Sequence, residues 1–312
     1  MKARAIGLVS GGLDSMIATR LMMSQGVDVF LIMFASPFFH SALLGKEKND
    51  FMDTKATIIE MGEEYLNIIK NPEYGYGSGI NPCIDCKIHM LKIAARIMEE
   101  KKASFIFTGE VLNQRPFSQT RTFMQLTEKK SGLKGRILRP LSAKLLDPTV
   151  PEIEGLIDRE KLLAISGRQR KQQLYLAEKL GIVGFSQPAG GCLLTDRIYS
   201  EKLNELIIRW PDAKMKDAEL IKHGRVFWHK DVLIVIGRNK IENELLANLA
   251  KTGDLVVYLE SVPGPLCVVR GKNIDNEAID WAKKKVLLYA RRPDVECRIV
   301  EAGKNEKKYQ GF

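Results

Sequence analysis

The sequence predicts an α/β protein built on a doubly wound parallel sheet, followed by a smaller α+β domain. An apolar run over residues 4–9 stops at two glycines, and helical spacing follows over residues 15–25. A second apolar run over residues 27–34 completes a β-α-β unit of the size that builds parallel sheets. The pattern becomes β-rich after about residue 210, which predicts the smaller domain.

The α/β rhythm continues through the first two thirds of the chain. We expect helices over residues 53–65 and 83–101, a strand over 104–108 and an interrupted helix over 159–181. Beyond Pro211 we expect strands over residues 232–236, 255–260 and 266–270, then a helix over 276–289. The predicted domains are therefore residues 1–210 and 211–312.

Charge and composition limit the class of protein. Lys and Arg outnumber Asp and Glu by 48 to 38, so a polyanionic partner is favoured, with nucleic acid first. No apolar run of about 18 residues and no signal-peptide pattern is present, so we expect a cytoplasmic protein without membrane contact. Five cysteines, two of them in a C-x-x-C pair, fit a reducing compartment. A homodimer is compatible with the sequence.

The segment with the most specific chemistry is the glycine turn over residues 10–15, called the phosphate loop below. Gly11 and Gly12 allow a tight turn, so backbone N–H groups and the helix N-terminus can face an anion. Ser10 and Ser15 add hydroxyl donors. Asp14 cannot favour a phosphate directly, so its expected role is to hold loop amides or a Mg²⁺ that bridges phosphate oxygens.

The phosphate loop has neither the Lys of a Walker A sequence nor the spacing of a dinucleotide fingerprint. It resembles the SGGxDS motif of the PP-loop ATP pyrophosphatases, which have the adenine nucleotide alpha hydrolase-like fold. That resemblance implies that ATP is cleaved to AMP and pyrophosphate and that the substrate is adenylated. A plain glycine turn in an α/β fold is the alternative.

Two further segments resemble tRNA thiouridine synthetases. The first matches the TGExLxQxxSQT and LRPL segments of 4-thiouridine synthetases; it comprises Thr108, Gly109, Glu110, Leu112, Gln114, Ser118, Gln119 and Thr120, with residues 138–141. The second, residues 81–87, is similar to the PCxxCN segment of 2-thiouridylases, where a distant third cysteine completes the set. Cys83, Cys86 and Cys192 are then the expected set, and Gly109 and Gln114 join the expected nucleotide site. The N-terminal tRNA-binding region typical of 4-thiouridine synthetases is expected to be missing, so the target uridine stays open.

The resemblance implies an ATP-dependent tRNA sulfurtransferase that adenylates a uridine carbonyl oxygen and replaces it with sulfur, giving 4-thiouridine or 2-thiouridine. Sulfur arrives either on a Cys192 persulfide resolved by Cys83 or Cys86, or through a [4Fe-4S] cluster held by all three cysteines. The donor is then sulfide or a persulfide-carrying desulfurase. Cys83 lies at an expected helix N-terminus, where the dipole should lower the thiol pKa. A structural zinc site or inert cysteines remain alternatives.

Basic residues are expected to contact tRNA. Residues 236–246, 254–255, 263–265 and 268–270 resemble the GRN, DDLWFH and PGSHV segments of the NFACT RNA-binding module, although Tyr258, Leu259 and Pro265 replace familiar positions. The candidate RNA contacts are Arg168, Arg170, Lys171, Arg238, Lys240 and Arg270. A structural docking domain is the alternative for the C-terminal module.

Two other functions stay open for the whole chain. One is an RNA-binding adaptor with a degenerate PP-loop domain. The other is an amidotransferase-like PP-loop ligase with ammonia as nucleophile, which would not need Cys83, Cys86 and Cys192.

Overall fold

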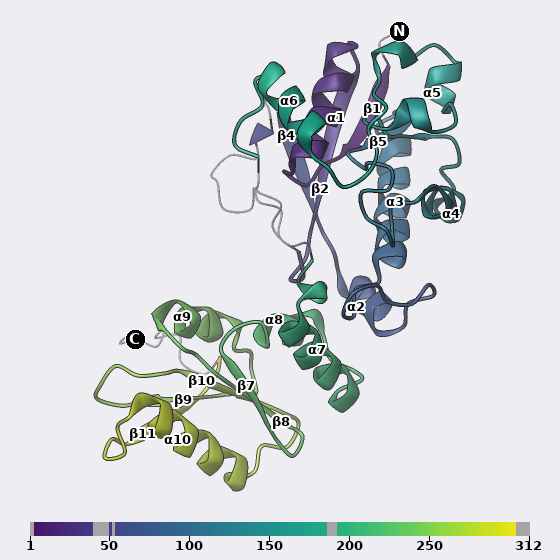
Figure 1. The fold of residues 1–312 in the computed structure, drawn as a ribbon. Coiled ribbons are helices and arrows are strands. Elements are labelled where there is room, and N and C mark those ends of the chain that lie inside the picture. Colours follow the sequence, from purple (N-terminus) through teal and green to yellow (C-terminus); the bar gives the residue numbers. More distant parts are fainter. Residues whose placement is uncertain (1–2, 40–49, 52–53, 186–191, 304–312) are drawn as a thin grey trace. The chain divides into compact units, whose positions relative to one another are not determined.

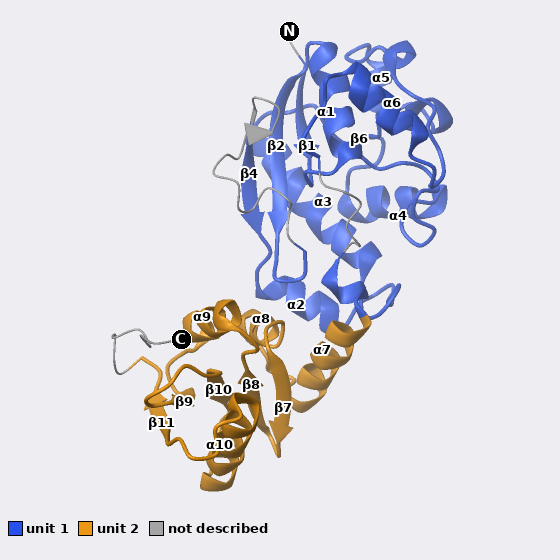
Figure 2. Ribbon diagram, turned by 60° about the vertical axis from the view of Figure 1, so that its left-hand side comes forward, with its two compact units in different colours: residues 1–196 blue, residues 197–312 orange. Residues whose placement is uncertain are grey.

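The computed structural model describes residues 3–39, 50–51, 54–185 and 192–303. These residues divide into two compact units, 1–196 and 197–312, drawn in blue and orange in Figure 2. In the described parts of the chain, no helix is both long and apolar enough to cross a membrane.

Unit 1 is built on a mainly parallel sheet (Figure 1), with the strand order β3-β4-β2-β1-β5-β6 among its described residues. All neighbours are parallel except the short β3, which is antiparallel to β4. The strands are β1 Arg4–Leu8, β2 Asp28–Ala35, β3 Asp50–Phe51, β4 Thr54–Glu60, β5 Phe105–Thr108 and β6 Ile137–Leu138. The α-helices are α1 Leu13–Ser24, α2 Glu63–Lys70, α3 Cys83–Glu100, α4 Arg121–Ser131, α5 Val150–Ile153 and α6 Lys171–Lys179.

Helices cover both faces of this sheet, because successive side chains on a strand point to opposite faces. Ala5, Leu31 and Phe107 point to the face on which α1 and α6 close one hydrophobic core. Ile6 and Ile106 are equally buried on the other face, where α3 contacts β1 and β5. The arrangement confirms the predicted α/β class with a parallel sheet.

One expected helix is wrong. Residues 53–65 contain a helical spacing of apolar residues, yet β4 occupies Thr54–Glu60 and α2 begins only at Glu63. The β-branched Thr57, Ile58 and Ile59 favour a strand, and pairing with β2 places this segment inside the sheet. Tertiary pairing therefore decides the structure of this segment.

Unit 2 contains an antiparallel sheet with the strand order β11-β9-β10-β8-β7 in its described residues. Its elements are α7 Arg197–Arg209, α8 Met215–Leu220, β7 Arg225–His229, β8 Val232–Ile236, α9 Lys240–Leu249, β9 Leu255–Leu259, β10 Cys267–Arg270, α10 Asn276–Ala290 and β11 Cys297–Glu301. Helix α10 covers one face of the sheet and closes a hydrophobic core with Ile234, Val257 and Val269. The smaller α+β domain at this end of the chain is confirmed.

Helix α7 is packed within unit 2. The Tyr199 hydroxyl donates to the Ala218 carbonyl at 2.8 Å, and the Trp210 indole N–H donates to the Asp231 carbonyl at 3.1 Å. The units therefore divide before α7, between Asp196 and Arg197, whereas the sequence placed a boundary near residue 210, after it.

Candidate active site

The phosphate loop connects β1 to α1, and its own side chains fix its conformation. Gly11 has a φ of +74°, a left-handed value that side chains rarely adopt. The Ser15 hydroxyl donates to the Gly12 carbonyl at 2.8 Å, and the Gly12 N–H faces the Ser10 hydroxyl oxygen at 3.4 Å. The loop is therefore shaped before any ligand arrives, with the N-terminus of α1 behind it.

Gly109, directly after β5, touches the phosphate loop through its backbone. A Cβ atom at this position would lie 2.5 Å from the Ser15 nitrogen and 2.7 Å from the Asp14 carbonyl carbon. No side chain fits there unless the backbone moves. The glycine in the TGE segment is therefore required by the close approach of two backbones.

Asp14 is the residue of the phosphate loop whose side chain is contacted by other segments of unit 1. The Gln114 side-chain amide donates to Asp14 Oδ2 at 3.0 Å, and the Arg170 guanidinium lies 4.0 Å from the same oxygen. Asp14 Oδ1 is buried and has no hydrogen-bond partner among the described residues. A buried carboxylate oxygen without a partner is costly, and a hard cation is the partner that it fits.

The C-x-x-C segment opens α3 beside the residues that follow β2. Asp85, between the two cysteines, accepts hydrogen bonds from the Glu73 and Tyr74 backbone N–H groups at 2.9 and 3.2 Å. It ties the loop over residues 71–82 to the start of the helix. The predicted helix start at Cys83 is correct.

Cys192 reaches the same place from far along the chain. The Leu193 N–H donates to the Phe38 carbonyl at 2.7 Å, and the Leu194 carbonyl accepts from the Ile80 N–H at 3.2 Å. Cys192 lies close enough to Cys83 for its pKa to respond to that thiol. The three expected cysteines therefore share one region of unit 1; residues 188–191, which precede Cys192, lie outside the described residues.

The pKa values of these thiols differ from the expectation. Burial raises the pKa of Cys83 even though Lys87 and Arg115 act to lower it. Burial likewise raises the pKa of Cys86 to about 12 and that of Cys192 to about 11. The expected lowering at the helix N-terminus is wrong, because desolvation of a buried thiolate outweighs the helix dipole here.

Tyr65, a residue that the sequence did not single out, lies against the cysteines. Its side chain is fully buried between Phe38 and Phe39, with ring centroids 5.9 Å from each, and it stacks on His89. Its hydroxyl has no nitrogen or oxygen partner in the described structure. The Tyr65 hydroxyl instead contacts the Cys86 thiol. Burial raises the pKa of Cys86, and the hydrogen bond with Tyr65 offsets part of that rise.

A buried ion network connects the cysteine segment to the TGE segment. Glu110 pairs with Lys87, which directly follows Cys86, and with Arg139 at 3.0 Å. Arg139 also pairs with Glu128. Burial alone would raise the pKa of Glu110, but Lys87 and Arg139 outweigh it and lower the pKa to about 2. Arg139 lies in the LRPL-like segment and Lys87 ends the PCxxCN-like segment, but the sequence predicted a role for neither.

Comparisons with known proteins agree with the two units. Residues 1–144 match the family model described as Thiamine biosynthesis protein (ThiI), and residues 224–311 match the NFACT protein RNA binding domain. Two parts of the chain thus resemble two different families, and the terms ThiI-type domain and NFACT-type domain refer below to these two resembling parts.

The ThiI-type domain is similar to two curated proteins named "Probable tRNA sulfurtransferase". The protein of Methanothermobacter thermautotrophicus is 28% identical over 151 residues, which is 45% of this chain and 36% of that protein. The protein of Thermococcus kodakarensis is 32% identical over 151 residues, which is 45% of this chain and 37% of that protein. The match therefore spans little more than a third of each relative. A crystal structure of a 4-thiouridine synthetase–RNA complex with bound ATP covers 70% of this chain and 54% of that chain, with 19% identity and a TM-score of 0.40.

The basic residues of unit 1 that were expected to contact RNA differ in position. Arg168 and Lys171 are exposed. Arg170 is instead half-buried beside Asp14, and its Nε atom is buried without a partner in the described residues. Arg170 is therefore placed at the phosphate loop, where a guanidinium suits a nucleotide phosphate.

The basic residues of the NFACT-type domain also separate into two groups. Lys240 is exposed at the start of α9, whereas Arg238 forms an ion pair with Glu242. Arg270 is only 3% exposed and pairs with Asp217 at 2.9 Å and Asp254 at 2.7 Å. Arg270 is thus a structural residue of the core, and we remove it from the RNA contacts.

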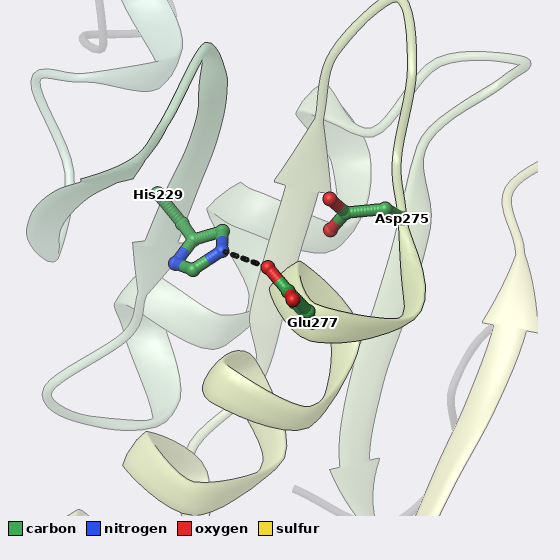
Figure 3. Close-up of side chains that lie close together, drawn as sticks. All are labelled: His229, Asp275 and Glu277. Atoms are coloured by element: carbon green, nitrogen blue, oxygen red, sulfur yellow. Dashed lines mark ion pairs between the residues drawn. The ribbon is translucent and has the colours of Figure 1, made fainter.

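A group of side chains that could ligate a metal ion lies in the NFACT-type domain. Among the described residues, only one set of three such side chains has its ligand atoms within 4.8 Å of one another, namely His229, Asp275 and Glu277 (Figure 3). The Lys230 ammonium lies 2.9 Å from Asp275 and 2.7 Å from Glu277, so a cation from the chain already neutralises both carboxylates. These contacts join the turn after β7 to the start of α10.

Proposed function

We propose that the chain is an ATP-dependent tRNA sulfurtransferase that converts a uridine carbonyl to a thiocarbonyl. The observation that carries this proposal is the position of two neighbouring residues. Gln114 holds Asp14 of the phosphate loop, and the charge of Arg115 acts on the thiols of Cys83 and Cys192. One short segment thereby connects an ATP-activating loop to a set of cysteines, and a sulfurtransferase needs both.

Activation is the role of the phosphate loop. The uridine carbonyl oxygen attacks the α-phosphorus of ATP, pyrophosphate leaves, and the oxygen becomes part of a good leaving group, AMP. The backbone N–H groups of Gly11 and Gly12 and the N-terminus of α1 would bind the pyrophosphate oxygens. The unpartnered Asp14 Oδ1 supports binding of a Mg²⁺ at this position. Such an ion would supply charge neutralisation of the leaving pyrophosphate.

The sulfur is delivered from the cysteines. Attack of a sulfur nucleophile on the adenylated carbon forms the C–S bond, AMP leaves with the oxygen, and the thiocarbonyl results. The donor set of Cys83, Cys86 and Cys192 fits a [4Fe-4S] cluster, because three thiols from two segments lie in one region of unit 1 and act on one another's pKa values. Such a cluster would supply an iron without a protein ligand, at which sulfide can be held.

The alternatives for these cysteines have less support. A persulfide route needs only two of the three cysteines, one to carry the sulfur and one to resolve it, so it leaves the third without a role. A single zinc ion needs ligands around one point, and among the described residues the three sulfur atoms do not lie within 4.8 Å of one another. Ligands on separate irons of a cluster are further apart. Inorganic sulfide is accordingly the proposed donor.

The experiment is a reaction under anaerobic conditions with ATP, sulfide and unmodified tRNA. We expect pyrophosphate, AMP and one thiolated uridine per tRNA, measured by nucleoside mass spectrometry, which also identifies 4-thiouridine or 2-thiouridine. Cys192→Ala should keep pyrophosphate release and lose the thionucleoside, whereas Cys297→Ala, in unit 2, should keep both. Absence of pyrophosphate release would favour an RNA-binding adaptor. Release that requires ammonia, with no thionucleoside, would favour a ligase.

A further inference from the structure

Strand β7 and helix α10 of unit 2 are joined by interleaved aromatic rings. Phe227 packs on Trp281 with ring centroids 5.4 Å apart and on Tyr289 at 6.2 Å, while His229 lies 6.3 Å from Trp281. Two cations complete the row: Lys285 lies 5.0 Å from the Trp281 ring, and Arg225 lies 4.3 Å from the Tyr289 ring. We call this row the β7–α10 seam; its members are Arg225, Phe227, His229, Trp281, Lys285 and Tyr289.

The seam lies on one side of β7 only. Alternate residues of the strand, Arg225, Phe227 and His229, contact α10, while Trp228 packs against Trp210 after α7. β7 is the edge strand of the sheet, and each of its residues is partly exposed. The rings are therefore positioned by the fold without being sealed inside it.

The two cations of the seam, and three more that are close to it in sequence, lack acidic partners among the described residues. In the described part of the chain, no carboxylate lies within ion-pair distance of Arg225, Lys284, Lys285, Arg291 or Arg292. Other cations of the same unit are neutralised: Lys272 by Asp212 at 2.9 Å, Arg238 by Glu242 and Arg270 by two aspartates. Uncompensated charge thus gathers at the C-terminal half of α10.

The two ends of the seam differ. At the His229 end, Asp275 and Glu277 are neutralised by Lys230, and Figure 3 shows His229 on the strand facing Glu277 on the helix. At the Tyr289 end, no carboxylate of the described residues pairs with the cations. An anionic polymer on the seam is therefore attracted most strongly at the Tyr289 end.

Partly exposed rings beside cations without acidic partners fit a polymer that carries both flat bases and phosphates. Unpaired bases stack on aromatic side chains and phosphates pair with the cations, whereas a duplex keeps its bases stacked inside. We infer that the β7–α10 seam binds a single-stranded segment of RNA by base stacking. This inference rests on the proposed function only for the kind of polymer, because a tRNA substrate has unpaired loops and ends.

The test measures binding of the full chain to a single-stranded oligouridylate and to a blunt RNA duplex of equal charge, over a range of salt concentrations. Trp281→Leu should weaken oligouridylate binding ~5-fold or more while leaving the salt slope unchanged. Lys285→Gln and Arg225→Gln should each lower the slope by ~0.7, the value for one phosphate contact on a single strand. Lys272→Gln and Arg298→Gln, whose charges are already paired, are the matched controls.

Binding of all three seam variants at wild-type strength would overturn the inference, as would equal weakening of oligouridylate and duplex by Trp281→Leu. If Trp281→Leu does not fold, as judged by thermal unfolding, Tyr289→Leu takes its place, because the Tyr289 ring belongs to the same seam and is exposed. A chain that binds oligouridylate through the seam but thiolates no tRNA would leave this inference standing and reject the proposed function. The reverse result would reject the seam alone.

Discussion

Gln114 donates a hydrogen bond of 3.0 Å to the carboxylate of Asp14, a residue one hundred positions earlier in the chain. This contact fixes one oxygen of the Asp14 carboxylate, while the other oxygen stays buried without a partner in the described structure. A carboxylate held on one side and open on the other is oriented for a ligand. The segment after β5 therefore acts on the phosphate loop through hydrogen bonding as well as through the packing of Gly109.

Removing the Asp14 carboxylate should stop adenylation of the uridine without affecting RNA binding. Asp14→Ala and Ser15→Ala should abolish pyrophosphate release, while Gln114→Ala, which only frees the carboxylate, should reduce it about 10- to 100-fold. Affinity for tRNA should stay at the wild-type value in all three. Pyrophosphate release with tRNA present is the measurement, and undiminished release from Asp14→Ala and Ser15→Ala would reject the role of the loop.

Gly109→Ala should be more damaging than its size suggests. The added Cβ meets the Ser15 backbone at 2.5 Å, so we expect a loss of about 1–3 kcal/mol in unfolding free energy and a large loss of ATP affinity. Gly62→Ala is the matched control, because its Cβ would have no atom within 4 Å and its φ is −79°. Equal behaviour of the two variants in thermal unfolding and nucleotide binding would contradict the close packing.

Protein prepared without oxygen should be coloured and contain iron and acid-labile sulfide. Replacing Cys83, Cys86 or Cys192 by Ala should remove both the cluster and thiolation, because each supplies one thiol. Cys297→Ala, in β11, should retain iron. Iron analysis, the visible spectrum and activity with free sulfide are measured together. Full activity in a metal-free preparation would reject the cluster and return Cys192 to the role of persulfide carrier.

The half-buried Glu110 should make stability depend on acidic pH. Its pKa falls from 4.5 to about 2 in the folded chain, so its contribution is complete above about pH 4.5 and is lost as the pH falls toward 2. Glu110→Gln should lower the unfolding free energy at neutral pH by about 3 kcal/mol and flatten its pH dependence in that range. The exposed Glu100→Gln serves as the control. Parallel unfolding curves for Glu110→Gln and the wild type would contradict this assignment.

The sequence predicted the parts of the fold and site that depend on local pattern. The glycine turn, the strand before it and the helix after it follow from residues 4–25 alone, and the start of α3 at Cys83 agrees with the C-x-x-C position. The structure of residues 53–65 was not predicted correctly, because the spacing of apolar residues alone cannot show that a segment pairs within a sheet. Strand β7 was missed as well, although Val226, Phe227 and Trp228 are residue types that favour a strand.

Burial is the property that the sequence could not supply for charged residues. Arg270 was expected on the surface because arginine usually lies there, but Asp217 and Asp254 neutralise it inside unit 2. The network of Lys87, Glu110 and Arg139 joins three segments that only the fold brings together. Nothing in the sequence indicated a role for Tyr65, because the residues that it contacts lie far from it along the chain.

The three cysteines differ in how far they are exposed to solvent. Cys86 is almost fully enclosed, whereas Cys83 and Cys192 are each partly exposed. An oxidant dissolved in water therefore reaches Cys83 and Cys192 first, and exposure to air should oxidise these two before Cys86. Peptide mapping of air-exposed protein should find Cys86 as a free thiol. Oxidation by air would then leave the Cys86 thiol unchanged.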